Sequence, residues 1–287
     1  MTILYHYCSN SAFHSIVENK SIWLSSLSLS NDSMEGKLVT EVLYELSKKD
    51  GLNKTSIKRL QDSAKSLEDI IDGLGFCLSE EGDLLSQWRG YASDATGVSI
   101  GFSKNYLETI SETSKDLYGT GFSLSKVEYE KNKQKKLIEP TYLKIKDLIK
   151  QGAFNNVGLH GLLDLRTQEE IDKESAEVKK ISKSLSLTVL TLFAKLFQLK
   201  TKAFREEQEW RLISYFVKSG TDPCLFRAKK NRIIPYRKFE LPVLKEDSIS
   251  EVIIGPKNIT PDYVIKSFLN QHGFKGVKVL RSEAAYR

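Results

Sequence analysis

The residues best suited to chemistry are the carboxylates of the segment FREEQEWRLI, residues 204–213. Three glutamates fall within four residues, directly before a run that predicts a strand. In an extended chain Glu207 and Glu209 point to the same side. One such carboxylate can hydrogen-bond a sugar hydroxyl while the other polarises an attacking group. The alternative is a charged strand entrance in which Arg205 and Arg211 form surface ion pairs that add little stability.

A second candidate is the histidine of the segment LYHYCS, residues 4–9. His6 lies between two tyrosines on a predicted first strand, with a short helix after it, and could hydrogen-bond a ligand together with Tyr7. A half-buried aromatic strand with one satisfied histidine explains the same pattern. Cys8 could be a thiolate beside His6, although no third orienting residue is visible. Together with His14 these residues make a poor metal set, because no fourth ligand is evident.

A third candidate is the segment QWRGYA, residues 87–92. Trp88 and Tyr91 flank an arginine and a glycine just before a predicted strand. The two aromatics could form a stacking surface for a planar ring, and Arg89 could contact a phosphate. The alternative is a core tryptophan at the end of a helix.

Composition and missing motifs exclude several classes of protein. The chain has 287 residues, 40% hydrophobic and 28% charged, which is typical of a globular protein. Its three cysteines form no CxxC motif and fit a reducing cytosol, and its four histidines are too few for a multi-histidine metal cluster. P-loop, Rossmann, HExxH, GxSxG, zinc-finger and RNA-recognition motifs are absent. A net charge of +6 could help a dinucleotide or polyanion approach.

The hydropathy pattern predicts a cytoplasmic protein without a membrane segment. The sequence begins MTILYH, without the basic and apolar regions of a signal peptide. Its most apolar stretch, Val189 to Leu199, is interrupted by Lys195 and is too short to span a bilayer. We expect this stretch to form a buried core helix.

The periodicity of apolar residues predicts an α+β protein with strands near both ends of the chain. Strands are predicted at residues 3–7, 22–24, 73–78, 97–102, 122–129, 210–217, 233–236, 252–255 and 275–280. Helices are predicted at 11–19, 34–49 and 55–71, in most of 130–200, and from Pro261 to Gly273. Ser11 and Thr260 are expected as N-caps, with Pro261 at the first helical position.

We expect one domain over residues 1–287, with a mixed or split β-sheet built from the two chain ends. Residues 130–200 are expected to be a helical insertion that forms a layer against this sheet. The three tryptophans, Trp23, Trp88 and Trp210, should be mostly buried.

Taken as a set, the motifs resemble a bacterial family catalogued only as a domain of unknown function, family 2971. The segments that carry this resemblance are LYHYCS, SIVENKSIWLSS, NDSMEG, LLSQWRGYASDATGVSIGF, FREEQEWRLI and VKVLRSEAAYR. They cover nearly the whole chain and are weakest in its helical middle. This family implies no activity.

The order of the motifs also resembles the ADP-ribosyltransferase superfamily. That resemblance implies that His6 holds the nicotinamide ribose and that Tyr91 stacks on the nicotinamide. It further implies that Glu209 bonds the ribose 2′-hydroxyl and stabilises an oxocarbenium-like transition state. Glu207 resembles the first glutamate of the E-x-E arrangement that activates an acceptor. The sequence departs from the pattern at Tyr7, where a small residue is usual, and it lacks a clear Ser-Thr-Ser strand.

Two functions therefore stand as hypotheses. The first is an NAD-dependent mono-ADP-ribosyltransferase, a toxin or phage-defence effector that uses NAD as co-substrate, needs no metal and modifies a protein or nucleic acid. The second is a non-catalytic protein that binds a nucleotide or nucleic acid through Arg89 and the lysine-rich helices. Convergence of His6, Tyr91 and Glu209 on one cleft would favour the enzyme.

Overall fold

The protein consists of two compact units. A computed structural model describes residues 2–30, 34, 36–114, 121–157, 166–218, 223–229, 231–243 and 248–286. The sheet unit comprises residues 1–31, 73–127 and 202–287. The helical unit comprises residues 32–72 and 128–201. Residues 130–200, predicted as a helical insertion, thus fall in the same compact unit as the two helices that precede residue 72.

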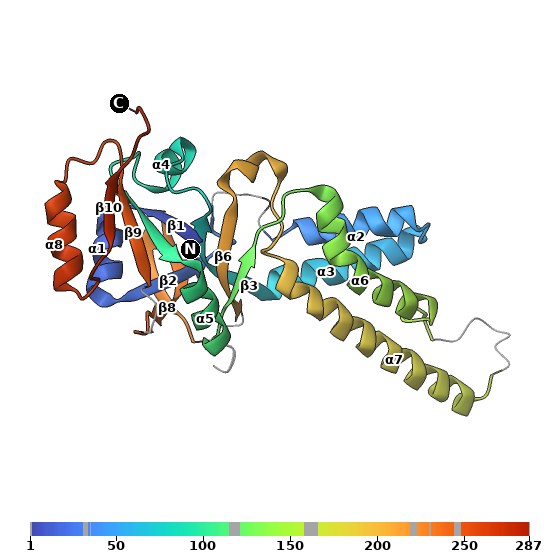
Figure 1. Ribbon diagram of the computed structural model, residues 1–287. Coiled ribbons are helices and arrows are strands. Elements are labelled where there is room, and N and C mark those ends of the chain that lie inside the picture. Colours follow the sequence, from blue (N-terminus) through green and yellow to red (C-terminus); the bar gives the residue numbers. More distant parts are fainter. Residues whose placement is uncertain are drawn as a thin grey trace. The chain divides into compact units, whose positions relative to one another are not determined.

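Ten strands and eight α-helices are found in the described residues (Figure 1). The strands are β1 (Ile3–Cys8), β2 (Ser21–Ser26), β3 (Ile71–Ser79), β4 (Val98–Ser103), β5 (Ser123–Lys126), β6 (Glu209–Val217), β7 (Leu225–Lys229), β8 (Arg232–Glu240), β9 (Ile249–Ile254) and β10 (Lys278–Arg281). The helices are α1 (Asn10–Asn19), α2 (Leu38–Lys49), α3 (Lys54–Ile70), α4 (Leu85–Tyr91), α5 (Lys104–Ser114), α6 (Lys131–Lys150), α7 (Gln168–Leu190) and α8 (Asp262–Gln271). Two 3₁₀ turns, η1 (Thr191–Lys195) and η2 (Lys202–Glu207), complete the list.

The strands form one mixed, largely antiparallel sheet. Its main order is β10-β9-β4-β1-β3-β2-β8-β7, while β6 pairs with β3 and β5. The pair β9–β10 is parallel and is connected through α8, as a parallel connection requires. Strands from both chain ends thus share this sheet, and the predicted α+β class with a mixed sheet is confirmed.

One face of the sheet packs on the main hydrophobic core. Along β1, Leu4 and Cys8 point into this core, where their neighbours across β4 are Phe102 and Val98. Helices α1, α5 and α8 cover the core with side chains such as Phe13, Tyr106, Leu107, Ile265 and Leu269. Figure 1 shows α1 and α8 beside each other at one end of the sheet.

A smaller hydrophobic cluster lies on the opposite face of β1. It contains Tyr7, Trp88, Ala92 and Ala95 together with Ile253, and α4 contributes its tryptophan. Because strand side chains alternate between faces, Tyr5 and Tyr7 must face away from Leu4 and Cys8. The short helix α4 therefore sits on the face that carries the tyrosines.

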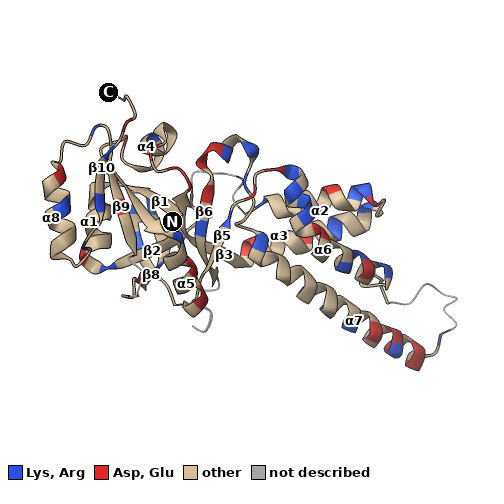
Figure 2. Ribbon diagram, viewed as in Figure 1, with Lys and Arg blue, Asp and Glu red and all other residues tan. Residues whose placement is uncertain are grey.

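The helical unit is formed by α2, α3, α6 and α7, which contact one another. Apolar residues at helical spacing, such as Leu43, Leu46 and Ile138, are buried in it. Helix α7 begins with a capping box between Thr167 and Glu170. Its charged residues are interleaved in sign (Figure 2), and most of Glu169 to Lys183 is exposed or half-buried, as predicted.

Several expectations need correction. The N-cap of α1 is Ser9, whose hydroxyl accepts the amide of Ala12, and not Ser11. Helix α8 begins after Pro261, which takes the N-cap position expected for Thr260. Trp88 is fully buried, whereas the tryptophans of β2 and β6 are half-buried. Helix α5 and strand β7 did not emerge from the sequence patterns.

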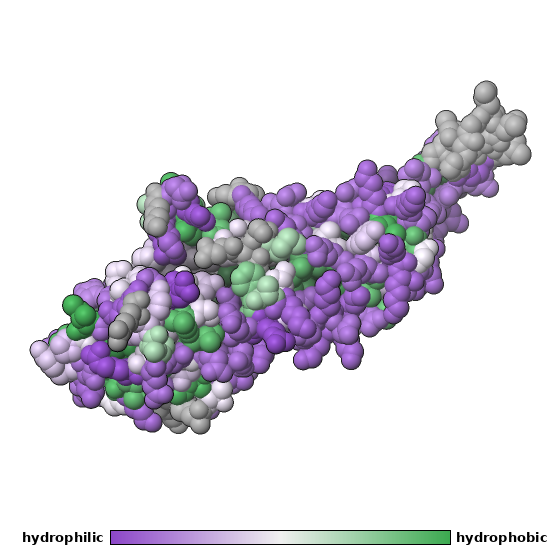
Figure 3. All heavy atoms as spheres, turned by 90° about the horizontal axis from the view of Figure 1, so that it is seen from above, coloured by the Kyte–Doolittle hydropathy of each residue, from purple (hydrophilic) through white to green (hydrophobic). Residues whose placement is uncertain are grey.

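The face of the molecule drawn in Figure 3 is mainly polar. On the face that Figure 3 shows, apolar residues form small separate patches within a hydrophilic surface. No helix in the described ranges combines the length and apolar character needed to cross a bilayer. The apolar stretch that begins at Val189 runs from the end of α7 into η1, and Leu192, Leu196 and Leu199 are buried there.

Candidate functional site

His6 points into the main core. It pairs with Ile100 of β4, a core residue, and its ring stacks on Phe76 at 3.9 Å between centroids. Its Nδ1 atom lies 2.8 Å from the carbonyl oxygen of Cys77. Burial lowers the pKa of His6 from 6.5 to about 4, although the hydrogen bond to Cys77 opposes that shift. His6 is therefore a neutral imidazole at pH 7.

Cys8 lies on the same face of β1 and is buried, whereas His6 is half-buried. Burial raises the pKa of its thiol from 9.0 to about 12. A thiolate nucleophile at this position would need the opposite shift.

Tyr7 organises the turn between β3 and α4. Its hydroxyl donates to the carbonyl oxygen of Glu81 at 2.7 Å and accepts the amide of Leu84 at 2.8 Å. Its ring meets Trp88 edge-on, with centroids 4.9 Å apart. The indole of Trp88 donates to Asp83 at 2.6 Å. Tyr7 therefore joins β1 to the segment that leads into α4, but it is itself buried.

Tyr91 and Glu207 meet although 116 residues separate them in the sequence. The hydroxyl of Tyr91 donates to Oε1 of Glu207 at 3.2 Å. The Ser79 hydroxyl donates to the Glu207 carbonyl oxygen at 2.7 Å and accepts the Glu81 amide at 3.0 Å. Gln208 donates to the carboxylate of Glu81 at 3.2 Å. These five residues form what we call the Tyr91–Glu207 cluster.

Glu207 and Glu209 do not follow the expected extended spacing. Glu207 ends the 3₁₀ turn η2, and Gln208 adopts a positive φ of 42° before β6 begins at Glu209. Such a φ is uncommon for a residue other than glycine. The reversal at Gln208 directs Glu207 toward Tyr91, which simple strand alternation could not predict.

Glu209 is buried and ion-paired with Arg211. Two hydrogen bonds of 2.7 and 2.8 Å join the guanidinium to the two carboxylate oxygens. The neighbouring residues Trp210 and Leu212 contact the main core, so Glu209 and Arg211 face away from it. His6 and Glu209 consequently point to opposite sides, so His6, Tyr91 and Glu209 do not converge on one cleft as the enzyme hypothesis expected. Tyr91 and Glu207 are in contact instead.

Arg89 is exposed at the end of α4. Its guanidinium lies 5.7 Å from the ring centroid of Tyr286, a residue that the sequence analysis did not single out. Glu81, Asp83 and Tyr286 are the main contributors that it missed. Tyr286 lies in VKVLRSEAAYR, one of the motifs of the family resemblance, but that motif indicated no function for it.

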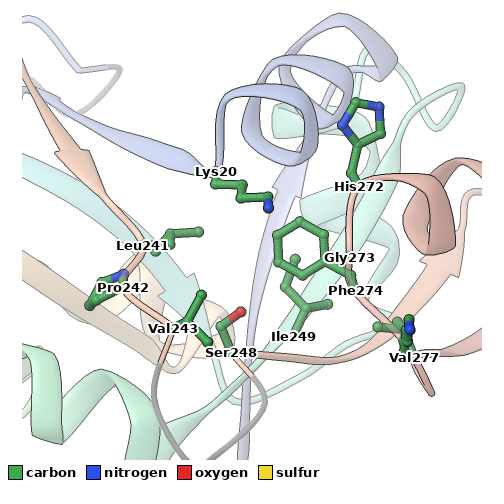
Figure 4. Close-up of a pocket in the computed structure, with 11 residues that line it drawn as sticks. Lys20, Leu241, Pro242, Val243, Ser248, Ile249, His272, Gly273, Phe274 and Val277 are labelled. Atoms are coloured by element: carbon green, nitrogen blue, oxygen red, sulfur yellow. The ribbon is translucent and has the colours of Figure 1, made fainter.

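No metal-binding group of described side chains marks this site, and the pocket of Figure 4 lies elsewhere. Among the described residues, no group of three or more His, Cys, Asp or Glu side chains could hold a metal ion. Figure 4 shows a pocket elsewhere in the sheet unit, where Lys20 and His272 lie at the rim above Phe274 and Ile249. None of the six predicted site residues lines that pocket.

The comparisons with known proteins support one family. The model of a family described as "Protein of unknown function (DUF2971)" matches residues 87–212. No curated protein matches the chain. No solved structure matches it either. The matched range begins at α4 and ends in β6, so it includes both partners of the Tyr91–Glu207 contact. The match over residues 87–212 supports the DUF2971 family, in agreement with the resemblance of the motifs.

Proposed function

We propose that this protein is an NAD-dependent mono-ADP-ribosyltransferase. The observation that carries the proposal is the hydrogen bond between Tyr91 and Glu207, which joins the aromatic motif to the acidic motif at the start of β6. An aromatic ring beside a carboxylate suits a substrate with a planar base and a ribose. An ADP-ribosyltransferase-like arrangement of the sheet is part of the proposal.

In the proposed reaction the bond between nicotinamide and C1′ of the ribose breaks, and nicotinamide leaves with the bonding electrons. A nucleophilic atom of the acceptor then bonds to C1′ and gives up its proton. Glu209 stabilises the positive charge that develops on the ribose, and the two hydrogen bonds from Arg211 orient this carboxylate. Glu207 accepts the proton of the acceptor.

The binding contacts of the proposed site come from α4. Tyr91 is 43% exposed, so its ring is accessible for stacking on nicotinamide. Arg89 is exposed two residues earlier and provides a cation for phosphate. Tyr7 supports the site indirectly, because its hydroxyl fixes the turn that leads into α4.

The contribution of His6 is indirect in this proposal. Its ring packs in the core and its Nδ1 bonds a strand carbonyl. A direct contact between His6 and the ribose would need a rearrangement of β1. We therefore assign His6 the role of fixing β1 against β3, and we leave ligand contact to the residues of the opposite face.

The test uses purified protein, NAD labelled on its adenylate phosphate, and a cell lysate treated with either nuclease or protease. We expect label in one macromolecular fraction and equimolar release of nicotinamide. Glu207→Gln should abolish the transfer of label but spare slow NAD hydrolysis, because abundant water can capture the cationic ribose without a base. The exposed neighbour Glu206 provides the matched control, Glu206→Gln.

Absence of nicotinamide release in every fraction would refute the transferase proposal. Equal loss of transfer in the Glu206 and Glu207 variants would remove Glu207 from the mechanism. A toxin or phage-defence role in the cytoplasm is our expectation for such an activity, and growth arrest on induction would be its cellular readout.

The burial of Glu209 against Arg211 favours a second candidate function, a non-catalytic nucleotide-binding protein. A carboxylate that is 5% exposed and neutralised by a guanidinium is also well explained as a structural ion pair. Under this alternative, nucleotides bind near Arg89 and no nicotinamide is released.

A further inference from the structure

A second cluster of charged and aromatic residues surrounds Tyr286. The ammonium of Lys257 lies 4.2 Å from the centroid of the Tyr286 ring, and the guanidinium of Arg89 lies 5.7 Å from it. The hydroxyl of Tyr286 donates to Asp94 at 2.7 Å. Lys257 forms an ion pair with the other carboxylate oxygen of Asp94, also at 2.7 Å. Three separate parts of the sequence therefore meet at one aromatic ring.

The backbone around this cluster is held by hydrogen bonds. Asp94 occupies the turn between α4 and β4, where Ser93, Asp94 and Ala95 all have positive φ angles of 51°, 52° and 69°. The amide of Ala95 donates to the carbonyl oxygen of Trp88, and the amide of Lys257 donates to the carbonyl oxygen of Ala95. The turn thus fixes the position of Lys257 relative to α4.

The segment that carries Tyr286 is anchored from the other side. Asp83 accepts hydrogen bonds from the hydroxyl of Ser282 and from the amide of Glu283. Ala284 and Tyr286 then pack against the small hydrophobic cluster of Tyr7 and Trp88. The aromatic ring is therefore held in place before any ligand arrives, which favours binding because little order is lost.

The two cations are accessible to solvent. Arg89 is exposed, the side chain of Lys257 is 28% exposed and that of Asp94 is 59% exposed. Cation–π contacts orient the guanidinium and the ammonium without neutralising their charge. At the Tyr286 ring, two cations, Arg89 and Lys257, lie beside one anion, Asp94, which favours an approaching anion.

We propose that Arg89 and Lys257 bind the diphosphate of a nucleotide, with one cation for each phosphoryl group. Tyr286 is the positioning residue that holds both cations on one ring, and Asp94 is the intramolecular anion that the ligand replaces at Lys257. The inference rests on the proposed function in one respect, that the natural ligand is the ADP half of NAD. Helix α4 then carries both the diphosphate contact, Arg89, and the nicotinamide contact, Tyr91.

Replacement of Asp94 should increase the affinity for the ligand, which is an unusual effect for the loss of an ion pair. Asp94→Asn removes the negative charge that competes with the ligand but keeps a side chain that tolerates a positive φ. Affinity for a diphosphate should therefore increase. A purely structural role of Asp94 predicts no change or a loss, because the ion pair to Lys257 disappears.

The experiment is a calorimetric titration of the purified chain with ADP at one fixed low salt concentration. We expect Lys257→Gln to weaken ADP binding about tenfold and Asp94→Asn to tighten it about threefold. Tyr286→Ala should weaken binding, and Tyr286→Phe should retain more of it because the ring remains. Lys266→Gln, which removes an exposed positive charge of α8, should leave the affinity unchanged.

Pyrophosphate should compete with ADP, and adenosine should not. The inference is overturned if wild type fails to bind ADP, if Lys266→Gln weakens binding as much as Lys257→Gln, or if Asp94→Asn also weakens it at an unchanged melting temperature. ADP binding with the expected pattern but without nicotinamide release would support this site and refute the transferase. Nicotinamide release, together with an ADP affinity that Lys257→Gln and Asp94→Asn leave unchanged, would support the transferase and refute this site.

Discussion

Glu209 and Arg211 form a bidentate ion pair inside the sheet unit, two residues apart on β6. Their exposed fractions are 5% and 1%, and both carboxylate oxygens accept an N–H of the guanidinium. Because β6 places residues i and i+2 on one face, the pair follows directly from the sequence E-x-R in a strand. Removal of either charge alone breaks both of these hydrogen bonds and takes the counter-charge away from a buried ion.

Loss of Arg211 should therefore destabilise the protein strongly. We expect Arg211→Met to lower the free energy of unfolding by about 3–5 kcal/mol, because the buried carboxylate of Glu209 loses two hydrogen bonds and its counter-charge. Urea unfolding followed by circular dichroism measures this difference. The matched control is Lys238→Met, which breaks an exposed i,i+2 pair with Glu240 on β8 and should cost less than about 1 kcal/mol.

The double variant Glu209→Gln with Arg211→Met should recover part of the lost stability, since neither position of the pair then carries a charge. Similar costs for Arg211→Met and Lys238→Met would contradict the reading of Glu209 and Arg211 as a coupled buried pair.

The Tyr91–Glu207 contact should matter more for activity than for folding. Tyr91→Phe removes one hydrogen bond from a side chain that is 43% exposed. We expect a change of no more than about 1 kcal/mol in the free energy of unfolding. Transfer of label to the acceptor should fall at least tenfold, because Glu207 loses a group that orients it. Leu85→Ala on the same helix, where 39% of the side chain is exposed, tests whether any change in α4 has the same effect.

His6 should make the stability of the protein depend on pH. Its pKa is about 4 in the folded chain and 6.5 in the unfolded chain, so the unfolded state binds the proton more readily. The stabilisation is complete above pH 6.5 and is lost as the pH falls toward 4. The full effect is about 3 kcal/mol, which corresponds to the size of this shift.

The measurement is a series of urea unfolding curves between pH 7 and pH 4 for wild type and for His6→Gln, whose amide can still donate to Cys77. Wild type should lose more stability over this range than the variant. Parallel pH profiles would show that His6 is not buried as a neutral ring.

Asp83 should hold the segment that carries Tyr286. Its carboxylate accepts from the Trp88 indole, the Ser282 hydroxyl and the Glu283 amide. Asp83→Asn replaces one accepting oxygen by a donor, and we expect a loss of about 1–3 kcal/mol. Amide hydrogen exchange should accelerate in residues 282–286, and the exposed Asp69→Asn should leave it unchanged. Unaltered exchange in Asp83→Asn would show that other contacts anchor this segment.

The sequence patterns predicted the regular elements better than the site. Helices such as α2 and α3 have apolar residues at a spacing of three and four, and their burial follows from that periodicity. The pair Glu209 and Arg211 was also within reach, because both residues lie in one regular strand. Local spacing is sufficient information for contacts of this kind.

Contacts that depend on irregular backbone were not predictable in this way. The positive φ of Gln208 turns Glu207 toward Tyr91, and the left-handed turn around Asp94 brings Lys257 to α4. The direction of His6 depends on which face of β1 meets the main core, and the alternation of Leu4, His6 and Cys8 contained that information. The run Tyr5, His6 and Tyr7 concealed it, because both faces of β1 then carry an aromatic ring.

The sharpest test of the proposed mechanism is the variant Glu209→Gln. It keeps the shape of the side chain and one hydrogen-bond acceptor for Arg211 but removes the negative charge. If Glu209 stabilises a cationic ribose, the rate of nicotinamide release should fall by about 10²–10³-fold while affinity for NAD changes much less, because the charge matters most in the transition state.

His6→Gln, which alters a core-facing residue, should change the rate only through stability. Melting curves must accompany both assays, since Glu209 is also the partner of a buried arginine. A wild-type rate in Glu209→Gln would exclude Glu209 from catalysis. A rate loss that follows the melting temperature, and that stabilising solutes restore, would make Glu209 a structural residue and leave the nucleotide-binding function as the better account.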